Sequence, residues 1–226
     1  MGVNPLIVAL DTADLGELEG LAGTLAPHVA YLKVGLEAFA AHGPTAVSVA
    51  GRHAPVFLDL KLHDIPHTVA AAAAAAARLE VGMLTVHASG GPAMIAAAAK
   101  VAPDVVVLGV TVLTSLDDSA MTAVGQRPVA EQVPRLAALA IHAGARGVVC
   151  AAGDVEAVRA AVGPDALLVV PGIRPQGADP GDQVRVASPG AAITAGADYL
   201  VVGRPVIASP DPAAAARAIL AEVHGG

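Results

Sequence analysis

The sequence predicts a (β/α)8 barrel, an α/β fold of the TIM-barrel type, from two observations. Eight short apolar runs, rich in Val, Ile and Leu, alternate along the chain with helical segments. These runs lack strict apolar–polar alternation, which is typical of parallel strands buried on both faces. Eight such strands, each followed by helical sequence, favour the closed barrel. An open doubly wound sheet is the competing architecture.

The predicted strands and helices follow one another in order. The strands are residues 6–10, 31–34, 56–60, 83–86, 105–110, 147–150, 167–170 and 199–202. The helices are residues 15–25, 36–50, 67–79, 92–101, 129–143, 155–161, 189–194 and 213–223. Several helices are rich in alanine, which has the highest helix propensity and suits close packing against a sheet. No Gly/Ser/Pro-rich linker divides the chain, so we expect a single catalytic domain over residues 1–226.

The composition excludes several classes of protein. Hydrophobic residues make up 55 % and charged residues 15 % of the chain, so it can bury a substantial core and is not disordered. The net charge of −7 argues against a nucleic-acid or anionic-membrane binder. The single cysteine, Cys150, excludes an intrachain disulfide. No basic segment opens a signal peptide, and we read the alanine run 69–77 as a helix of a soluble protein. We therefore expect a cytoplasmic protein that does not bind membranes.

Charged residues are scarce, yet they gather where the predicted strands end. In a barrel, the carboxyl ends of the strands carry the catalytic groups. These ends and the residues just after them include Asp11, Lys33, Asp59, Lys61, Asp64, His87, Thr114, Arg174, Gly203 and Arg204. The sequence therefore predicts an active site for a small-molecule substrate at this end of the barrel.

The centre of this predicted site is the string Asp59-x-Lys61-x-x-Asp64. Residues two apart on a strand share a face, so Asp59 and Lys61 should both point into the barrel mouth. Lys33, from the neighbouring strand, can reach Asp59 and extend the row to four alternating charges. A lysine between carboxylates is favoured in its charged form, which makes it a good proton donor and a poor base.

Two other interpretations of these charges stay open. They could form an ion-pair network that merely closes the barrel, although burying four charges is a poor way to gain stability. Alternatively, Asp11, Asp59 and Asp64 could be ligands of a hard cation. Two lysines among these three carboxylates make the cation less favourable, because they already neutralise the site.

A second group of residues predicts a phosphate site. Gly203-Arg204-Pro205 follows the eighth strand, where glycine permits close backbone approach and proline suits the first turn of a helix. A helix N-terminus with a guanidinium binds anions, and barrel enzymes commonly hold phosphate after strands seven and eight. Arg174 can supply a second guanidinium. The long loop 176–188, which carries Gln183, is interpreted as a lid.

With these motifs, the sequence resembles the orotidine 5′-phosphate decarboxylase family, in its bacterial short form, nearly end to end. The most specific part is LDLKLHDIPHT at residues 58–68, an Asp-x-Lys-x-x-Asp-Ile-Pro-x-Thr string. Further similarity lies at residues 9–11, 32–35, 110–115, 171–175, 181–183 and 201–205. The resemblance implies decarboxylation of orotidine 5′-phosphate to UMP in pyrimidine biosynthesis, with no metal and no organic cofactor.

Carried over to matching positions, the resemblance also implies residue roles. Lys61 would protonate C6 of the pyrimidine as carbon dioxide leaves, and Asp59 would lie against the substrate carboxylate. Asp11 and Lys33 would hold the ribose hydroxyls, with Lys33 also positioning Asp59. Thr114 would contact the pyrimidine. The phosphate would be bound by Arg174, Gln183, Gly203 and Arg204. In a homodimer with shared active sites, Asp64 and Thr68 would reach into the active site of the partner subunit.

Two alternatives of different kinds remain. A sugar-phosphate lyase or decarboxylase of the same superfamily, such as the 3-keto-gulonate phosphate type, would share the Asp-x-Lys-x-x-Asp string but use Mg²⁺ and an enediolate. The continuation at residues 65–68 and Gln183 favour the pyrimidine enzyme. A non-catalytic nucleotide-binding protein is the other alternative. The joint presence of Asp59, Lys61 and Asp64 argues against it.

Overall fold

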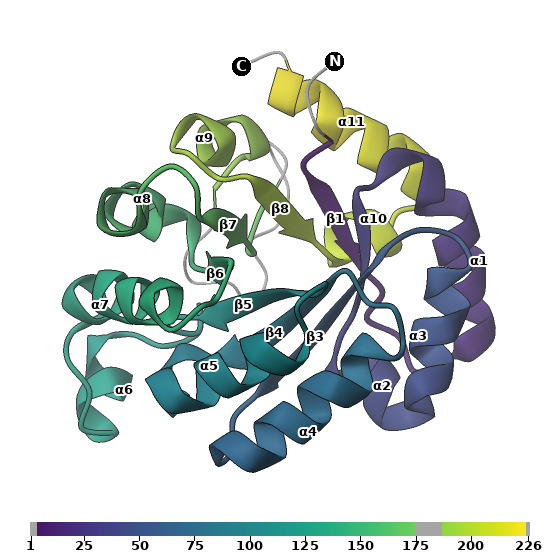
Figure 1. The fold of residues 1–226 in the computed structure, drawn as a ribbon. Helices are drawn as coiled ribbons and strands as arrows, with labels where there is room; N and C mark the ends of the chain where they lie inside the picture. Colours follow the sequence, from purple (N-terminus) through teal and green to yellow (C-terminus); the bar gives the residue numbers. More distant parts are fainter. Residues whose placement is uncertain (1–3, 175–186, 225–226) are drawn as a thin grey trace.

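In a computed structural model, the chain forms a closed barrel of parallel strands in the order β1 to β8 (Figure 1). The structure describes residues 4–174 and 187–224. The strands are β1 Leu6–Ala9, β2 Tyr31–Val34, β3 Val56–Leu62, β4 Met83–His87, β5 Val106–Val110, β6 Gly147–Val149, β7 Leu167–Val170 and β8 Tyr199–Val202. Because β8 pairs with β1, the predicted (β/α)8 barrel is confirmed and the open sheet is wrong.

Helices connect the strands and surround the barrel (Figure 1). Over the described residues, the α-helices are α1 Leu15–Leu25, α2 Leu36–His42, α3 Pro44–Gly51, α4 Pro66–Ala77, α5 Pro92–Val101, α6 Asp118–Ala123, α7 Val129–His142, α8 Val155–Val162, α9 Pro189–Thr194, α10 Arg204–Ile207 and α11 Pro212–His224. Short 3-10 helices occur at η1 Ala26–His28, η2 Ala88–Gly90 and η3 Ala152–Asp154. Small side chains let this outer layer lie close to the strands. A Cβ on Gly109 of β5, for example, would lie only 2.5 Å from the Cβ of Ala140 on α7.

The main differences from the sequence prediction lie in residues 36–51, at the end of the third strand and in residues 118–123. The helix expected over residues 36–50 is two helices, α2 and α3, because Gly43 adopts a left-handed backbone (φ 56°) and Pro44 then begins α3. The third strand runs two residues further than expected, to Leu62. Helix α6 was not predicted. The side chain of Asp117 caps it by accepting a hydrogen bond from the backbone N–H of Ala120 (2.8 Å).

The core has two parts, one outside and one inside the barrel. One part fills the space between the strands and the helices. The other lies inside the barrel and consists of Ile7, Ala9, Phe57, Met83, Val106, Leu108, Val169 and Val201. Asp59 and Thr85 follow Phe57 and Met83 by two residues on their strands, and both are buried. The inside of the barrel therefore changes from apolar to polar toward the carboxyl ends of the strands.

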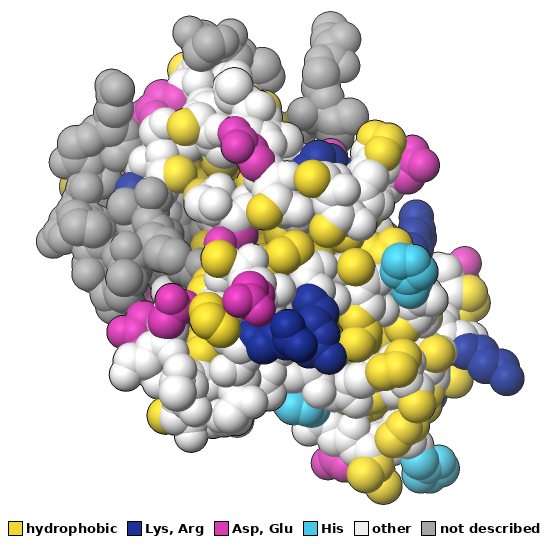
Figure 2. Space-filling view, turned by 90° about the vertical axis from the view of Figure 1, so that its left-hand side faces the viewer, with side chains coloured by type: hydrophobic (Ala, Val, Ile, Leu, Met, Phe, Trp, Pro, Cys, Tyr) yellow, Lys and Arg dark blue, Asp and Glu magenta, His cyan; other side chains and the backbone are white. Residues whose placement is uncertain are grey.

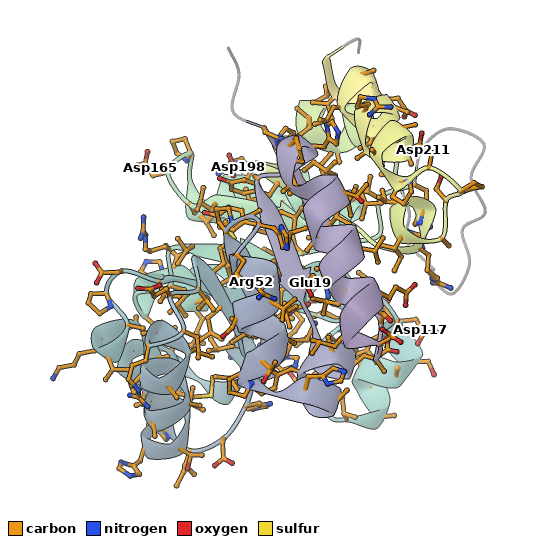
Figure 3. The ribbon with its side chains drawn as sticks, turned by 90° about the vertical axis from the view of Figure 1, so that its right-hand side faces the viewer. Glu19, Arg52, Asp117, Asp165, Asp198 and Asp211 are labelled. Atoms are coloured by element: carbon orange, nitrogen blue, oxygen red, sulfur yellow. The ribbon has the colours of Figure 1, made fainter. Side chains whose placement is uncertain are left out.

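The outer surface carries mixed charges. On the face with α6, α7 and α8, Figure 2 shows one compact group of Lys and Arg side chains with Asp and Glu side chains beside it. On the opposite side, Arg52 after α3 forms an ion pair with Glu19 of α1 (2.9 Å), and both side chains are more than half exposed (Figure 3). No helix among the described residues has the length and apolar character needed to cross a bilayer.

Candidate active site

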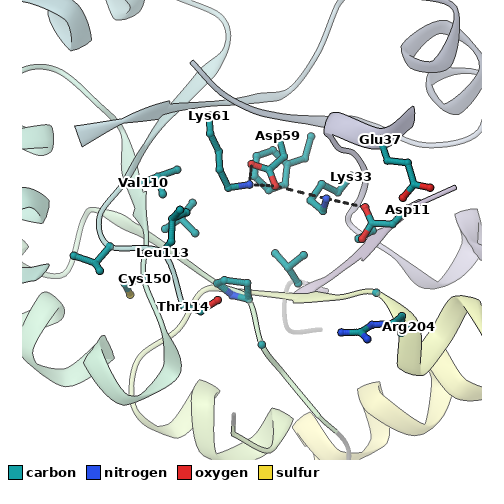
Figure 4. Close-up of a pocket in the computed structure, with 18 of the residues that line it drawn as sticks. Asp11, Lys33, Glu37, Asp59, Lys61, Val110, Leu113, Thr114, Cys150 and Arg204 are labelled. Atoms are coloured by element: carbon teal, nitrogen blue, oxygen red, sulfur yellow. Dashed lines mark hydrogen bonds and ion pairs between the residues drawn. The ribbon is translucent and has the colours of Figure 1, made fainter. Parts of the chain in front are cut away.

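A pocket of about 480 Å³ lies at the carboxyl ends of the strands (Figure 4), a size typical of small-molecule sites. Its charged lining comprises Asp11, Lys33, Glu37, Asp59, Lys61, Arg174 and Arg204. Its apolar lining includes Val110, Val112, Leu113, Val149 and Cys150. Four cations and three anions among the described lining residues make the pocket slightly positive, although the chain as a whole carries −7. The pocket therefore suits an anionic ligand with one apolar part.

Four charges of alternating sign form a row along one wall of this pocket (Figure 4). Lys33 Nζ lies 3.2 Å from Asp11 Oδ1 and 3.6 Å from Asp59 Oδ2. Lys61 Nζ lies 2.8 Å from Asp59 Oδ2. The predicted reach of Lys33 to Asp59 is confirmed. The fourth charge of the row is Asp11, which lies beyond Lys33. The sequence prediction had instead given Asp64, beyond Lys61, as the fourth charge.

Asp59 is the most heavily bonded residue of the row. It is only 9 % exposed, and its two oxygens accept hydrogen bonds from Lys61 Nζ (2.9 and 2.8 Å). Oδ1 also accepts one from the hydroxyl of Thr85 (2.9 Å). Burial raises the pKa of the Asp59 carboxyl, but the charges of Lys33 and Lys61 and these hydrogen bonds together hold the pKa below its usual value. Asp59 is therefore a carboxylate at neutral pH.

The backbone of Lys61, whose side chain lines the pocket, has an unusual conformation. Lys61 has φ 51°, in the left-handed region that lysine seldom occupies. Strand β3 is irregular between Leu58 and Leu62, where its pairing with β4 shifts. Asp59 and Lys61 both line the pocket, as predicted, but simple strand alternation is not the whole reason.

Gly35 leaves the space in which the Lys33 ammonium sits. A Cβ at this position would lie 2.8 Å from Lys33 Nζ and 3.3 Å from Asp11 Oδ1. Any larger residue would therefore displace the ammonium from Asp11. This explains in physical terms why glycine follows Lys33 by two residues in the chain.

Asp64 and Thr68 lie apart from the row. Both are exposed, and neither belongs to the described lining of the pocket. Asp64 Oδ1 accepts a hydrogen bond from the N–H of Ile65 (2.6 Å), and within residues 4–174 and 187–224 no ion pair joins it to Lys61. Asp11, Asp59 and Asp64 are thus not assembled as a cation site. Across the described part of the chain, no three His, Cys, Asp or Glu residues are placed to share a metal ion.

The predicted phosphate residues lie on the β7–β8 side of the pocket. Arg174 follows β7, and Gly203 and Arg204 form the start of α10. Figure 4 shows Arg204 and Lys61 on opposite sides of the pocket. Thr114 lines the pocket after β5. Gln183 and most of the expected lid lie in residues 175–186, outside the described residues.

Sequence reasoning missed two polar residues near the row, Glu37 and Thr85. Glu37 lines the pocket from the first turn of α2. Thr85 is fully buried beside Asp59, and a polar residue at an inward position of β4 was the available signal. His87 ends β4, as the sequence predicted. Its ring lies 5.4 Å from that of His63, and burial, His63 and Lys61 together lower the pKa of His87.

The chain is similar over nearly its whole length to proteins of one family. The model of the family described as "Orotidine 5′-phosphate decarboxylase / HUMPS family" matches residues 4–219. The chain is 58 % identical over 219 residues to an orotidine 5′-phosphate decarboxylase of Anaeromyxobacter sp. (strain K), with 96 % of each chain covered.

A second relative and a crystal structure extend the similarity. The chain is 53 % identical over 223 residues to an orotidine 5′-phosphate decarboxylase of Thermobifida fusca (strain YX), covering 97 % of this chain and 96 % of the relative. The crystal structure of the decarboxylase from Lactobacillus acidophilus matches with a TM-score of 0.87 at 37 % identity, covering 98 % and 99 % of the two chains. The chain therefore belongs to the orotidine 5′-phosphate decarboxylase / HUMPS family.

Proposed function

We propose that the pocket binds orotidine 5′-phosphate and that Lys61 delivers a proton to C6 of the pyrimidine as carbon dioxide leaves. The reaction of this chain is decarboxylation of orotidine 5′-phosphate to UMP, a carboxy-lyase step of pyrimidine biosynthesis. The observation that carries the role of Lys61 is its ammonium, held 2.8 Å from the buried carboxylate of Asp59 at the mouth of the barrel.

The chemistry requires an adjacent cation. When the bond between C6 and the carboxylate breaks, its electron pair stays on C6 in an sp² orbital that cannot delocalise as an enolate would. The enzyme must therefore supply stabilisation toward the ~23 kcal/mol upper end of common rate enhancements. A preorganised ammonium meets this charge without reorganisation and then transfers its proton to C6. Substrate and one proton give UMP and carbon dioxide, and the neutral amine regains its proton from solvent, so the step balances without a metal or organic cofactor.

The remaining residues bind and orient the substrate. We propose that Asp11 and Lys33, joined at 3.2 Å, hold the ribose hydroxyls, and that Thr114 contacts the pyrimidine. On the opposite side, Arg174, Gly203 and Arg204 bind the phosphate. We propose that Gln183, which lies outside the described residues, binds the phosphate as well. Binding energy from the phosphate is then available to orient the ring against Asp59 and Lys61.

We further propose a cytoplasmic homodimer that shares its two active sites. Asp64 is exposed and not paired with Lys61 of its own described chain, and the next residue, Ile65, is 65 % exposed although it is large and apolar. An exposed apolar side chain beside the site supports a subunit contact there. In this arrangement, Asp64 and Thr68 of each subunit reach the pocket of the other.

The substrate is tested by incubating the protein with orotidine 5′-phosphate and following the loss of its ultraviolet absorbance. We expect the absorbance to fall, and to fall at the same rate in EDTA. No loss would refute the proposed substrate. A loss that disappears in EDTA and returns with Mg²⁺ would instead show that the reaction on this substrate depends on a metal ion.

The shared site is tested by mixing two inactive variants. Lys61→Ala and Asp64→Ala are each expected to be nearly inactive. Unfolded and refolded together in equal amounts, they form about half heterodimers, each with one site that carries both changes and one that carries neither. About a quarter of wild-type activity should return. If Asp64 serves its own subunit, every site keeps one defect. Absence of recovery, with heterodimers detected by native mass spectrometry, would then rule out sharing.

A further inference from the structure

The irregularity in β3 creates a local problem that the fold has to solve. Phe57 and Leu58 pair with Met83 and Leu84, but the next pair is Leu62 with Val86. Between these pairs β3 advances four residues and β4 only two, so the segment from Asp59 to Lys61 bulges from the regular ladder. A left-handed backbone is unfavourable for a residue with a side chain. The conformation of Lys61 (φ 51°) therefore has to be held by its surroundings.

The hydroxyl of Thr85 on β4 occupies this gap. It accepts a hydrogen bond from the backbone N–H of Lys61 (2.9 Å) and donates one to Oδ1 of Asp59 (2.9 Å). Only a group that is both donor and acceptor can make these two bonds at once. Since Asp59 in turn accepts from Lys61 Nζ, the three residues form a closed ring of hydrogen bonds.

A purely structural role does not explain a threonine here. Thr85 is 0 % exposed, and it follows the apolar Met83 on the inner face of the barrel. A buried hydroxyl has to be satisfied by partners, whereas valine has nearly the same shape and would pack there without that requirement. What valine cannot do is link the backbone of Lys61 to the carboxylate of Asp59.

We propose that Thr85 is a positioning residue for the decarboxylation: its hydroxyl fixes the left-handed backbone of Lys61 and the carboxylate of Asp59 in one geometry, so that the ammonium is aimed before substrate binds. The proposal rests on the role of Lys61 as the proton donor. Thr85 itself touches neither the substrate nor the reacting atoms in this scheme. Its loss should therefore lower the rate of the chemical step more than it weakens ligand binding.

The test compares Thr85→Val with Thr85→Ser, since only the serine variant keeps the hydroxyl. Thr85→Val is expected to lower kcat about 10- to 100-fold while the Kd for UMP changes by less than about threefold. Thr85→Ser should stay within about fivefold of wild-type kcat. Thr111→Val is the matched control. Thr111 is also buried, but its hydroxyl donates to the carbonyl of Val149 (2.8 Å), so kcat should stay within about twofold.

A pH profile separates positioning from a loss of packing. The charged groups that face Asp59 are Lys33 and Lys61, and His87 lies close enough to interact electrostatically. The hydrogen bond from Thr85 helps to hold the pKa of Asp59 down, so Thr85→Val should shift the acid limb of kcat/KM toward higher pH. Thr85→Ser and Thr111→Val should leave that limb in place.

The outcomes are distinguishable from failure of the proposed function. If wild type decarboxylates orotidine 5′-phosphate but Thr85→Val retains kcat within about twofold, the role of Thr85 is overturned while the reaction stands. An equal loss of kcat in Thr85→Val and Thr85→Ser would also overturn it, because the hydroxyl would then be irrelevant. If Thr85→Val does not fold, Thr85→Ala is compared with Thr85→Ser by the same measurements and the same criteria.

Discussion

Lys33 should stabilise the folded protein as well as bind substrate, because it compensates the buried carboxylate of Asp59. Lys33 Nζ and Asp59 Oδ2 are 3.6 Å apart, and their side chains are only 11 % and 12 % exposed. At an effective dielectric constant near 20, that distance corresponds to an attraction of about 4–5 kcal/mol. Part of it is offset by the cost of burying the ammonium, and Asp59 keeps Lys61 and Thr85 as partners. We therefore expect Lys33→Met to lower the free energy of unfolding by about 2–3 kcal/mol.

The assay is urea unfolding at pH 7.5 and fixed protein concentration, followed by circular dichroism, with an unchanged m-value. Arg52→Met is the matched control, since it breaks an exposed pair with Glu19 and should cost at most about 1 kcal/mol. The difference in the free energy of unfolding between wild type and Lys33→Met should become smaller below about pH 4. The pKa of the Asp59 carboxyl is lowered in the folded protein, so its contribution to stability is lost as the pH falls through that pKa. A Lys33→Met protein as stable as wild type at pH 7.5 would refute this reasoning.

Three further predictions concern other parts of the site. Gly35→Ala should lower kcat/KM at least about tenfold, because the new Cβ displaces Lys33 Nζ. Gly20→Ala is the control and should leave kcat/KM unchanged, because a Cβ there meets nothing within 4 Å. Equal kinetics of the two variants would contradict this prediction. The pKa of His87 is lowered in the folded protein. Below about pH 6.5 the unfolded state therefore binds more protons than the folded state, and the free energy of unfolding decreases as the pH decreases. His87→Gln should flatten this slope below about pH 6.5 in urea titrations, and a slope equal to wild type would exclude His87 as its cause. Arg204→Ala should lower kcat/KM by about tenfold or more through loss of a charge-assisted phosphate contact, and unchanged kinetics at low substrate would argue against a phosphate at this position.

Much of the barrel could be predicted because its strands are buried on both faces and its helices are not. The runs at Tyr31–Val34, Leu167–Val170 and Tyr199–Val202 are strands with the predicted bounds. The break between α2 and α3 was visible in the sequence as Gly43-Pro44, but the apolar pattern on both sides hid it. Helix α6 is only six residues long and depends on its cap at Asp117, so periodicity had too few residues to detect it.

Most charged residues of the pocket were predictable from the sequence, but their geometry was not. Charges at the strand ends pointed to Asp11, Lys33, Asp59 and Lys61, and the structure brings these four together. The left-handed backbone of Lys61 depends on how β3 pairs with β4, and a single strand's sequence does not specify that pairing. Thr85 was missed for the same reason, because its importance comes from a contact between strands 24 residues apart in the chain.

The proton-donor role of Lys61 is tested most directly by the turnover of Lys61→Ala on orotidine 5′-phosphate, measured beside the affinity of the same variant for UMP. Lys100→Ala is the control, because Lys100 is the one lysine of the sequence that lies outside the pocket, exposed near the end of α5. The account predicts that Lys61→Ala loses all but about a hundredth of kcat or less and still binds UMP, since the phosphate residues lie across the pocket. Lys100→Ala should match wild type in both measurements. If Lys61→Ala retained a tenth of wild-type kcat, Lys61 would not be the proton donor.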